Sequence, residues 1–261
     1  MHRFFVPHYQ IEKDQIFIFG SDINHIVNVL RMTNGDKLEV FDSFANTYKA
    51  KIKEIQNNKI ICSILKTSKD NKEAAVKVSL AQCLPKGKKM DLIIQKTTEL
   101  GVFDIIPVES ERSVPKIEDK ADKKIEHWQK IAKEASEQSG RTIVPEIKPL
   151  IKFETLIKSC PKYDLKLIPW EGEQNNNLKK FICCREKFNP KGSDSNRCLL
   201  KSPPLLDNGI LILIGPEGGF SQNEVESAKQ NSFIPISLGK RILRTETAAI
   251  ALLAQIFYEF E

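Results

Sequence analysis

The chain has 261 residues, enough for one large domain or two modest ones. Hydrophobic residues make up 41% and charged residues 28%, a balance typical of soluble globular proteins and unlike that of disordered or fibrous chains. The formal net charge of +6 is a mild bias towards polyanions. No apolar run approaches a membrane span and the N-terminus has no signal-peptide core, so we expect a cytoplasmic protein without membrane contact.

Cysteine usage points in the same direction. The sequence has 6 cysteines, scattered and without a C-x-x-C pair. In a chain of this size, that spacing favours reduced thiols over a disulfide framework or a zinc site. We therefore expect no bound metal.

The first 70 residues predict a small β-rich unit. Apolar residues at helical spacing over 23–30 predict one helix, with Ser21 or Asp22 as its N-cap. Asn34-Gly35 is a turn signal. Short apolar or alternating runs predict strands, which together with the helix suggest a small barrel. These runs are residues 4–6, 16–19, 37–41, 47–55 and 59–65.

Residues 66–76 are polar and lack periodicity, which predicts a linker. We place the domains at 1–70 and 77–261, joined by 71–76. In the second domain strands and helices alternate, the pattern of an α/β fold with a parallel sheet. The expected strands are 76–83, 105–108, 165–168, 210–214 and 234–238. The expected helices are 89–100, 119–139, 152–158, 178–184, 224–230 and 245–261, and residues 185–207 are expected to be a flexible insertion.

Residues 210–220 read ILILIGPEGGF, a buried strand that ends in a glycine-rich loop. The three glycines can adopt positive φ and bring bare backbone close to a ligand. Ser221 then reads as an N-cap, and Glu224 completes a capping box. Open α/β sheets bind ligands at the carboxyl ends of strands, although a plain turn without a ligand is also compatible with this stretch.

A second signal is the lysine cluster over residues 86–89, at the start of an expected helix. Cations there oppose the helix dipole, so their presence beside exposed N–H donors suggests a nearby anion. The alternative is a flexible basic loop.

These stretches resemble one family. GPEGGF and LGKRILRTETAA, together with HRFFV, the H…VLR pattern, KGKKM…QKTTELG and EASEQSGR, resemble the RsmE-type family of SPOUT methyltransferases. The resemblance implies a C-terminal α/β SPOUT domain with a deep trefoil knot, preceded by a PUA-like RNA-binding barrel. It also implies a homodimer that uses S-adenosyl-L-methionine to methylate N3 of a uridine in 16S ribosomal RNA of the 30S subunit.

Site residues are carried over from the same motifs. Gln138 and Arg141 would position the substrate, because an amide can pair with a base edge and an arginine with phosphate or a uracil oxygen. Plain structural roles are the alternative, and Arg244 and Glu246 would then pair with each other. The implied RNA contacts are Arg3, His25, Arg31, Lys86 and Lys89. The implied cofactor contacts are Gly215, Pro216, Glu217, Gly218, Gly219, Leu238, Gly239, Ile242, Leu243, Arg244, Glu246, Thr247 and Ala248.

The chemistry needs an aligned methyl group, exclusion of water and loss of the N3 proton. The sequence identifies no obligatory general base. Two other functions stay open: a SPOUT enzyme that methylates ribose 2′-OH of transfer or ribosomal RNA, and a non-catalytic RNA-binding protein.

Overall fold

A computed structural model describes residues 1–69, 72–114, 120–159, 163–182 and 206–260. Its contacts divide the chain into two compact units. The first comprises Met1–Glu73 with Lys130–Pro145, and the second comprises Ala74–Gln129 with Glu146–Glu261. Residues 130–145 thus group with the N-terminal unit, although they lie within the range expected for the second domain. The boundaries 1–70 and 77–261 stay a prediction.

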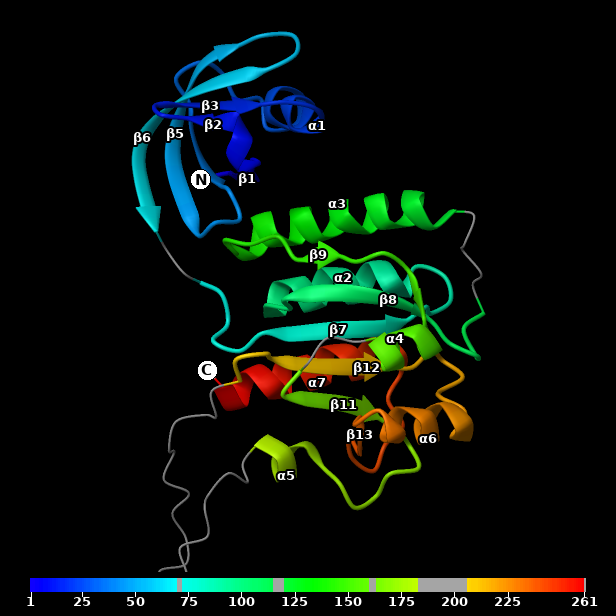
Figure 1. Ribbon diagram of the computed structural model, residues 1–261. Helices are drawn as coiled ribbons and strands as arrows, with labels where there is room; N and C mark the ends of the chain where they lie inside the picture. The colour runs from blue at the N-terminus through cyan, green and yellow to red at the C-terminus, as the bar shows by residue number, and fades with distance from the viewer. Residues whose placement is uncertain (70–71, 115–119, 160–162, 183–205, 261) are drawn as a thin grey trace, which may run out of the picture. The chain divides into compact units, whose positions relative to one another are not determined.

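The N-terminal unit is built on a 6-stranded sheet with the order β1-β4-β5-β6-β3-β2. Only β1 and β4 pair in parallel, and register shifts within the β5–β6 pair mark irregularities of the ladder. β1 and β2 lie at the two ends of this order, and among the described residues no pairing joins them. The sheet is therefore curled but is not closed into a barrel by hydrogen bonds (Figure 1). The strands are β1 (Arg3–Phe5), β2 (Ile11–Glu12), β3 (Gln15–Ile18), β4 (Lys37–Phe41), β5 (Asn46–Ile55) and β6 (Ile60–Lys69).

Alternation explains the core of this unit. Side chains at every second position of a strand point to one face of the sheet, and here they are apolar and buried. β2 was not predicted, and β6 runs on into the expected linker to Lys69. The buried cluster contains Phe4, Val6, Ile16, Ile18, Ile26, Leu38, Val40, Ala50, Ile52, Ile60 and Cys62.

The predicted helix over 23–30 is present in altered form. α1 (Ser21–Asn24) continues as a π-helical turn over His25–Val29. The N-cap prediction was wrong, because Gly20 occupies that position and no side chain caps the helix. Asp22 instead accepts hydrogen bonds from Lys133, with Nζ–O distances of 2.8 and 2.6 Å.

The second unit contains a 7-stranded sheet whose main order is β10-β8-β7-β12-β11-β13, with β9 paired to β8. All of its pairings are parallel. The strands are β7 (Val78–Cys83), β8 (Asp104–Glu109), β9 (Glu146–Ile147), β10 (Ile151–Lys152), β11 (Leu165–Pro169), β12 (Ile210–Ile214) and β13 (Ile234–Ile236).

Helices cover both faces of this sheet (Figure 1). On one face, Leu211 and Leu213 of β12 pack with α4 and α6, and on the other face α2 and α7 contact each other. Every residue of β12 is therefore buried, which explains its unbroken apolar sequence. The helices are α2 (Lys89–Leu100), α3 (Ala121–Ser139), α4 (Phe153–Ser159), α5 (Leu178–Ile182), α6 (Gln222–Gln230) and α7 (Thr245–Phe260).

The predicted capping box is confirmed. Ser221 and Glu224 form the full capping box of α6. Gly101 ends α2 in a left-handed conformation at φ 106°, and its N–H bonds to the last turn. Cys62 and Cys83 are free and buried. The predicted insertion lies outside the described residues except for residues 206 and 207. No helix in the described part of the chain is long and apolar enough to cross a membrane.

Gly209 is the tightest backbone position in the second unit, and its replacement by Ala is expected to destabilise the protein. It has φ +75°, and an added Cβ would lie 2.4 Å from the Lys77 carbonyl oxygen. The backbone at Lys77 cannot move aside without disturbing the strand pairing. Strain and overpacking together should therefore lower the free energy of unfolding by roughly 2–5 kcal/mol. Urea unfolding measures this cost. Gly20→Ala is the matched control, because it has φ +74° with open space, and an equal loss in both variants would contradict the clash.

Candidate cofactor pocket and substrate-contact residues

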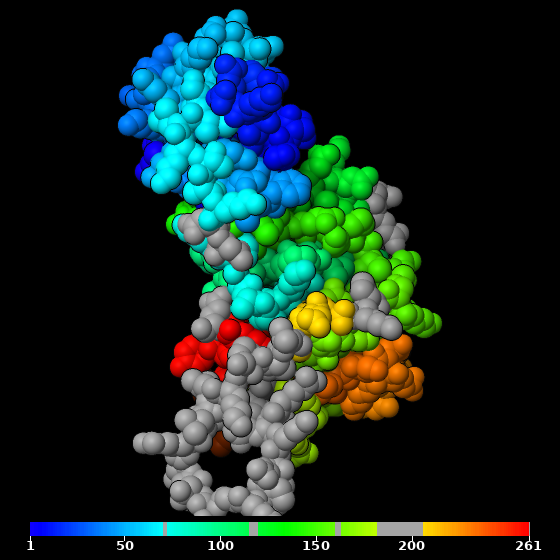
Figure 2. Space-filling view, turned by 60° about the vertical axis from the view of Figure 1, so that its left-hand side comes forward, coloured from blue at the N-terminus to red at the C-terminus, as the bar shows by residue number. Residues whose placement is uncertain are grey.

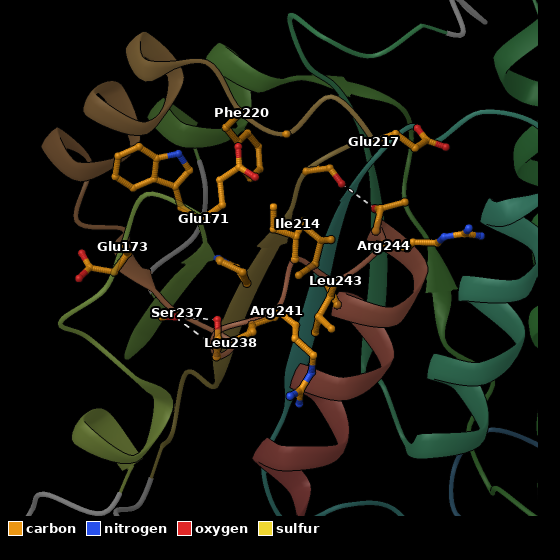
Figure 3. Close-up of a pocket in the computed structure, with 18 of the residues that line it drawn as sticks. Glu171, Glu173, Ile214, Glu217, Phe220, Ser237, Leu238, Arg241, Leu243 and Arg244 are labelled. Atoms are coloured by element: carbon orange, nitrogen blue, oxygen red, sulfur yellow. Dashed lines mark hydrogen bonds between the residues drawn. The ribbon is translucent and has the colours of Figure 1, made fainter.

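A cavity of about 940 Å³ lies at the carboxyl ends of the parallel strands in the second unit. Three segments line it, each following a strand: residues 169–177 after β11, 214–220 after β12 and 237–245 before α7. In Figure 3 Ile214 and Leu243 lie in the middle, Glu173 on one side and Arg244 on the other. The cavity lining mixes apolar residues with polar and charged ones, and ligand sites commonly combine the two.

A buried hydrogen-bond chain fixes the end of β12. The hydroxyl of Thr245 donates to the Gly215 carbonyl at 2.6 Å, and the Gln82 Nε2 donates to the Thr245 Oγ1 at 3.0 Å. Gln82 is fully buried, so this chain is shielded from water. It ties the first glycine loop to the start of α7. Local sequence patterns could not predict it, because the three residues are far apart along the chain.

The glycines of the first loop serve different purposes. Of the three, only Gly219 uses a positive φ, of 65°. At Gly215 an added Cβ would meet the Phe220 ring at 3.1 Å, and at Gly218 it would meet the Arg112 Cβ at 3.3 Å. Space rather than backbone conformation therefore favours glycine at these two positions. The Arg112 Nη1 also donates to the Gly218 carbonyl at 2.9 Å.

Glu217 is held by the start of α2. Its carboxylate accepts from the Lys86 N–H at 3.1 Å and from the Lys89 Nζ at 2.7 Å. Partial burial acts to raise the pKa of Glu217, but these hydrogen bonds outweigh it and hold that pKa below its usual range. The lysine cluster thus has an anion beside it, as its position suggested, and this anion is a side chain of the glycine loop.

The lining segment after β11, residues 169–177, was not predicted from the sequence. Trp170, Glu171 and Glu173 all line the cavity, although no motif singled them out. Backbone N–H groups of Asn175 and Asn176 bond the Glu173 carboxylate and lower its pKa. The available signal was the end of the β11 strand before a polar stretch, since carboxyl ends of parallel strands meet at one edge.

Most of the carried-over cofactor residues meet at the cavity. Glu246 and Thr247 do not line it. The Glu246 carboxylate lies 3.9 Å from the Lys89 Nζ, and among the described residues no ion pair joins it to Arg244. The lining set contains Gly215, Pro216, Glu217, Gly218, Gly219, Leu238, Gly239, Ile242, Leu243, Arg244 and Ala248, together with Lys89 and Thr245. Their roles in binding stay a prediction.

Two of the predicted basic contact residues in the N-terminal unit, Arg3 and Arg141, are engaged with protein groups. The Arg3 Nε lies 2.8 Å from the Glu39 carboxylate, and its guanidinium stacks 4.4 Å from the Phe41 ring centre. Arg141 is only 6% exposed, and its Nε donates to Glu73 at 3.0 Å. Both arginines therefore organise the unit, and their predicted contacts with RNA stay predictions.

Other predicted RNA contacts are open to solvent. His25, Arg31 and Gln138 are exposed in the N-terminal unit, and Lys86 is exposed in the second. Arg31 has φ 55°, an uncommon conformation for a residue other than glycine. Exposure makes these side chains available to a partner, and their assignment to RNA stays a prediction.

Glu137, beside Gln138, should make stability depend on pH. Burial raises its pKa from 4.5 to about 7. A carboxyl whose folded pKa is raised costs stability as the pH increases from about 4.5 to about 7, and the full cost remains above that window. In the variant Glu137→Gln the amide oxygen still accepts from the Phe5 N–H, a 2.9 Å bond in the native chain, without ionising.

The Glu137→Gln variant should therefore gain up to roughly 3 kcal/mol of unfolding free energy near pH 8 and little near pH 4.5. Urea unfolding of both proteins across this range measures the difference. A constant difference at all pH values would show that Glu137 does not titrate as its burial implies.

Comparison with known proteins defines the class of this chain. Residues 72–257 match the family model described as RNA methyltransferase domain, and residues 20–65 match the one described as RNA methyltransferase PUA domain. The chain thus consists of an RNA methyltransferase domain preceded by an RNA methyltransferase PUA domain.

Relatives place the chain more closely. It is 36% identical over 266 residues to ribosomal RNA small subunit methyltransferase E of Bacillus subtilis, with 100% of this chain and 98% of the relative covered. The chain belongs to the ribosomal RNA small subunit methyltransferase E family.

Solved structures agree. The Neisseria gonorrhoeae methyltransferase E bound to S-adenosyl methionine has a TM-score of 0.81 at 30% identity, covering 98% of this chain and 96% of that one. A Legionella pneumophila structure, titled as a methyltransferase with the bound cofactor SAM, has a TM-score of 0.83 at 30% identity with the same coverage. The α/β SPOUT domain preceded by a PUA-like β unit is confirmed, and the trefoil knot stays a prediction.

Proposed function

We propose that this protein uses S-adenosyl-L-methionine to methylate N3 of a uridine in 16S ribosomal RNA. The observation that carries the proposal is the cavity at the strand ends, lined by the glycine-rich loop of residues 215–219 and by the loop around Gly239, which both resemble the family's cofactor loops. Related structures of about this size contain the cofactor. The uridine N3 and the particular position in the RNA come from the family resemblance.

The cavity fits a sulfonium nucleoside. Its volume of about 940 Å³ falls at the upper end of ligand pockets, which leaves room for part of a target base. Backbone groups of the loop at Gly215 and Gly218 suit the polar edges of an adenosine, and Ile214, Leu238 and Leu243 suit its apolar faces. When bound, the cofactor supplies an electrophilic methyl group.

The chain's own residues contribute position and environment. The buried hydrogen bonds from Gln82 to Thr245 and from Thr245 to Gly215 hold the loop in one conformation. Little of the cofactor's binding energy is therefore spent on ordering this loop. Ile214, Leu238 and Leu243 give the cavity an apolar part. An apolar environment would favour a reaction in which a sulfonium cation and an imide anion neutralise each other. Glu217 is fixed by Lys86 and Lys89 and therefore keeps its negative charge near the cavity.

The proposal includes partners and location. The N-terminal unit would bind the RNA, within the 30S subunit, and the enzyme would act in the cytoplasm. The homodimer rests on the family resemblance alone, because the apolar face of α7 is buried within the chain. The RNA contact, the 30S context, the cytoplasmic location and the homodimer all come from the family resemblance.

Nucleoside analysis of ribosomal RNA from a deletion strain tests the reaction. We expect loss of 3-methyluridine from 16S RNA, restored by the wild-type gene. Loss of a 2′-O-methyl mark instead would identify a ribose methyltransferase and overturn the proposal.

Calorimetry tests the cofactor independently. We expect S-adenosylmethionine and S-adenosylhomocysteine to bind the purified chain. Absence of binding by both, with RNA binding retained, would identify a non-catalytic RNA-binding protein.

A further inference from the structure

The loop between β4 and β5, residues 42–45, carries unusual backbone strain. Ser43 has φ 62° and Ala45 has φ 59°, and both are residues that rarely adopt positive φ. Such conformations persist where surrounding contacts over-determine them, and they concentrate at functional sites. The strain therefore directs attention to Phe44, the residue between them.

A buried carboxylate holds the loop in this conformation. Asp42 is 1% exposed and accepts from the Phe44 N–H at 2.9 Å and the Asn46 Nδ2 at 2.8 Å. It also accepts from the Tyr48 hydroxyl at 3.1 Å and lies 3.0 Å from the His8 Nδ1. One side chain thus fixes both the loop backbone and the His8 ring.

This network presents an aromatic pair to solvent. Phe44 is 68% exposed, although its neighbours are tightly bonded. The His8 side chain is 58% exposed, and its ring meets the Phe44 ring edge-on with centroids 5.3 Å apart. Tyr9, the next residue along, is 83% exposed. An exposed phenylalanine on a rigid, strained loop loses little freedom when a flat partner stacks on it.

The strands that leave this loop are basic. Lys49 of β5 lies directly opposite Lys66 of β6, and Lys69 lies opposite Asn46 at the base of the loop. All three lysines are exposed, and like charges directly opposite each other destabilise a sheet. Glu39 pairs across from Lys49, but Arg3 already engages its carboxylate at 2.8 Å. A polyanion would relieve this repulsion, and the surface of β5 and β6, in light blue and cyan, is open in Figure 2.

The loop is also joined to the segment with the EASEQSGR motif. The Ser43 Oγ accepts from the Val144 N–H at 3.2 Å, three residues beyond Arg141, within the same unit. The strained loop therefore borders residues that resemblance assigns to the substrate, and it lies inside residues 20–65, which match the PUA domain model.

We propose that Phe44 and His8 form a stacking platform for one unpaired nucleobase of the RNA substrate, with Lys49 and Lys66, which share one face of the sheet, holding the adjoining phosphates. Single-stranded RNA is bound in this way because every base offers a flat face to an aromatic ring while lysines neutralise the backbone. The proposal rests on the proposed function, since it names part of that enzyme's RNA contact surface.

The test is equilibrium binding of the full chain to in-vitro-transcribed 16S ribosomal RNA. We expect Phe44→Ala to raise the Kd by about 5- to 150-fold, the effect of losing one stacked base. Phe44→Trp should bind as the wild type does, and Phe44→Leu should fail as Ala does, because leucine has no aromatic face. The salt dependence should stay the same in all three, whereas Lys49→Ala combined with Lys66→Ala should reduce its slope.

Phe103→Ala is the matched control. Phe103 is 41% exposed and precedes β8, at the sheet edge opposite the cavity, so its removal should leave RNA binding unchanged. Full binding by Phe44→Ala, rescue by Phe44→Leu, or an equal loss on a fully paired RNA duplex would each overturn the platform. Calorimetry with S-adenosylmethionine separates this from the proposed function, because wild type that does not bind the cofactor refutes the enzyme and leaves the RNA result to stand alone.

Discussion

Replacing Glu73 with Ala is expected to lower the free energy of unfolding by roughly 3–5 kcal/mol, the range for removing one partner of a buried ion pair. The Glu73 carboxylate receives the Arg141 Nε at 3.0 Å, the Thr142 N–H at 2.9 Å and the Ile143 N–H at 3.0 Å. Arg141 is 6% exposed. Without the carboxylate, water cannot readily replace it around the guanidinium and the two backbone donors.

Urea unfolding measures the loss, and two variants calibrate it. Glu73→Gln keeps an acceptor and should lose less, because only the charge is removed. Glu146→Ala removes a surface pair, Glu146 with Lys148, in which the glutamate side chain is 64% exposed, and should change stability by less than about 1 kcal/mol. Equal, small effects of Glu73→Ala and Glu146→Ala would mean that Glu73 does not support residues 141–143.

This pair also explains a limit of sequence reasoning. Arg141 was singled out by a motif and by the chemistry of arginine, and both were compatible with a substrate contact. Its partner lies 68 positions earlier, in a stretch expected to be a linker. No periodicity or spacing connects a polar linker residue with the end of a distant helix, so the packing could not be anticipated.

Local signals were more informative, because their physics acts over a few residues. Alternation predicted β4 and β5, and the spacing of Ser221 and Glu224 predicted their capping box. The predicted N-cap at Ser21 or Asp22 was wrong, because Gly20 occupies that position and Asp22 pairs with Lys133 on another element.

The lining of the cavity was predicted only in part, because local motifs mark some of its segments and long-range strand pairing brings in the rest. Two of its segments carry the motifs GPEGGF and LGKRILRTETA, whereas the segment with Trp170 reaches the cavity only through the strand order. That order places β11 between β12 and β13, so the carboxyl ends of all three strands meet at one edge. Sheet order depends on long-range pairing, which a single sequence does not reveal.

Replacing Gly239 with Val is expected to weaken binding of S-adenosylmethionine by about 5- to 150-fold, if the proposed function holds. Gly239 lines the cavity with φ +110°, a conformation that a β-branched residue avoids. An added Cβ meets nothing within 4 Å, so the variant should fold and relieve its strain by moving the loop. Movement there displaces the backbone between Leu238 and Leu243, on which the pocket depends.

Matched variants distinguish this loop effect from general damage. Gly20→Val also places valine at positive φ, +74°, in open space, but in the N-terminal unit, so calorimetry should find its cofactor affinity unchanged. Gly218→Val acts through contact instead, since its Cβ would press on Arg112 at 3.3 Å, and should also weaken binding. If both pocket variants bind as tightly as the wild type, the two glycine loops do not form the cofactor site. If Gly20→Val loses affinity as well, strain alone disturbs the protein and the effect of Gly239→Val says nothing specific about the pocket.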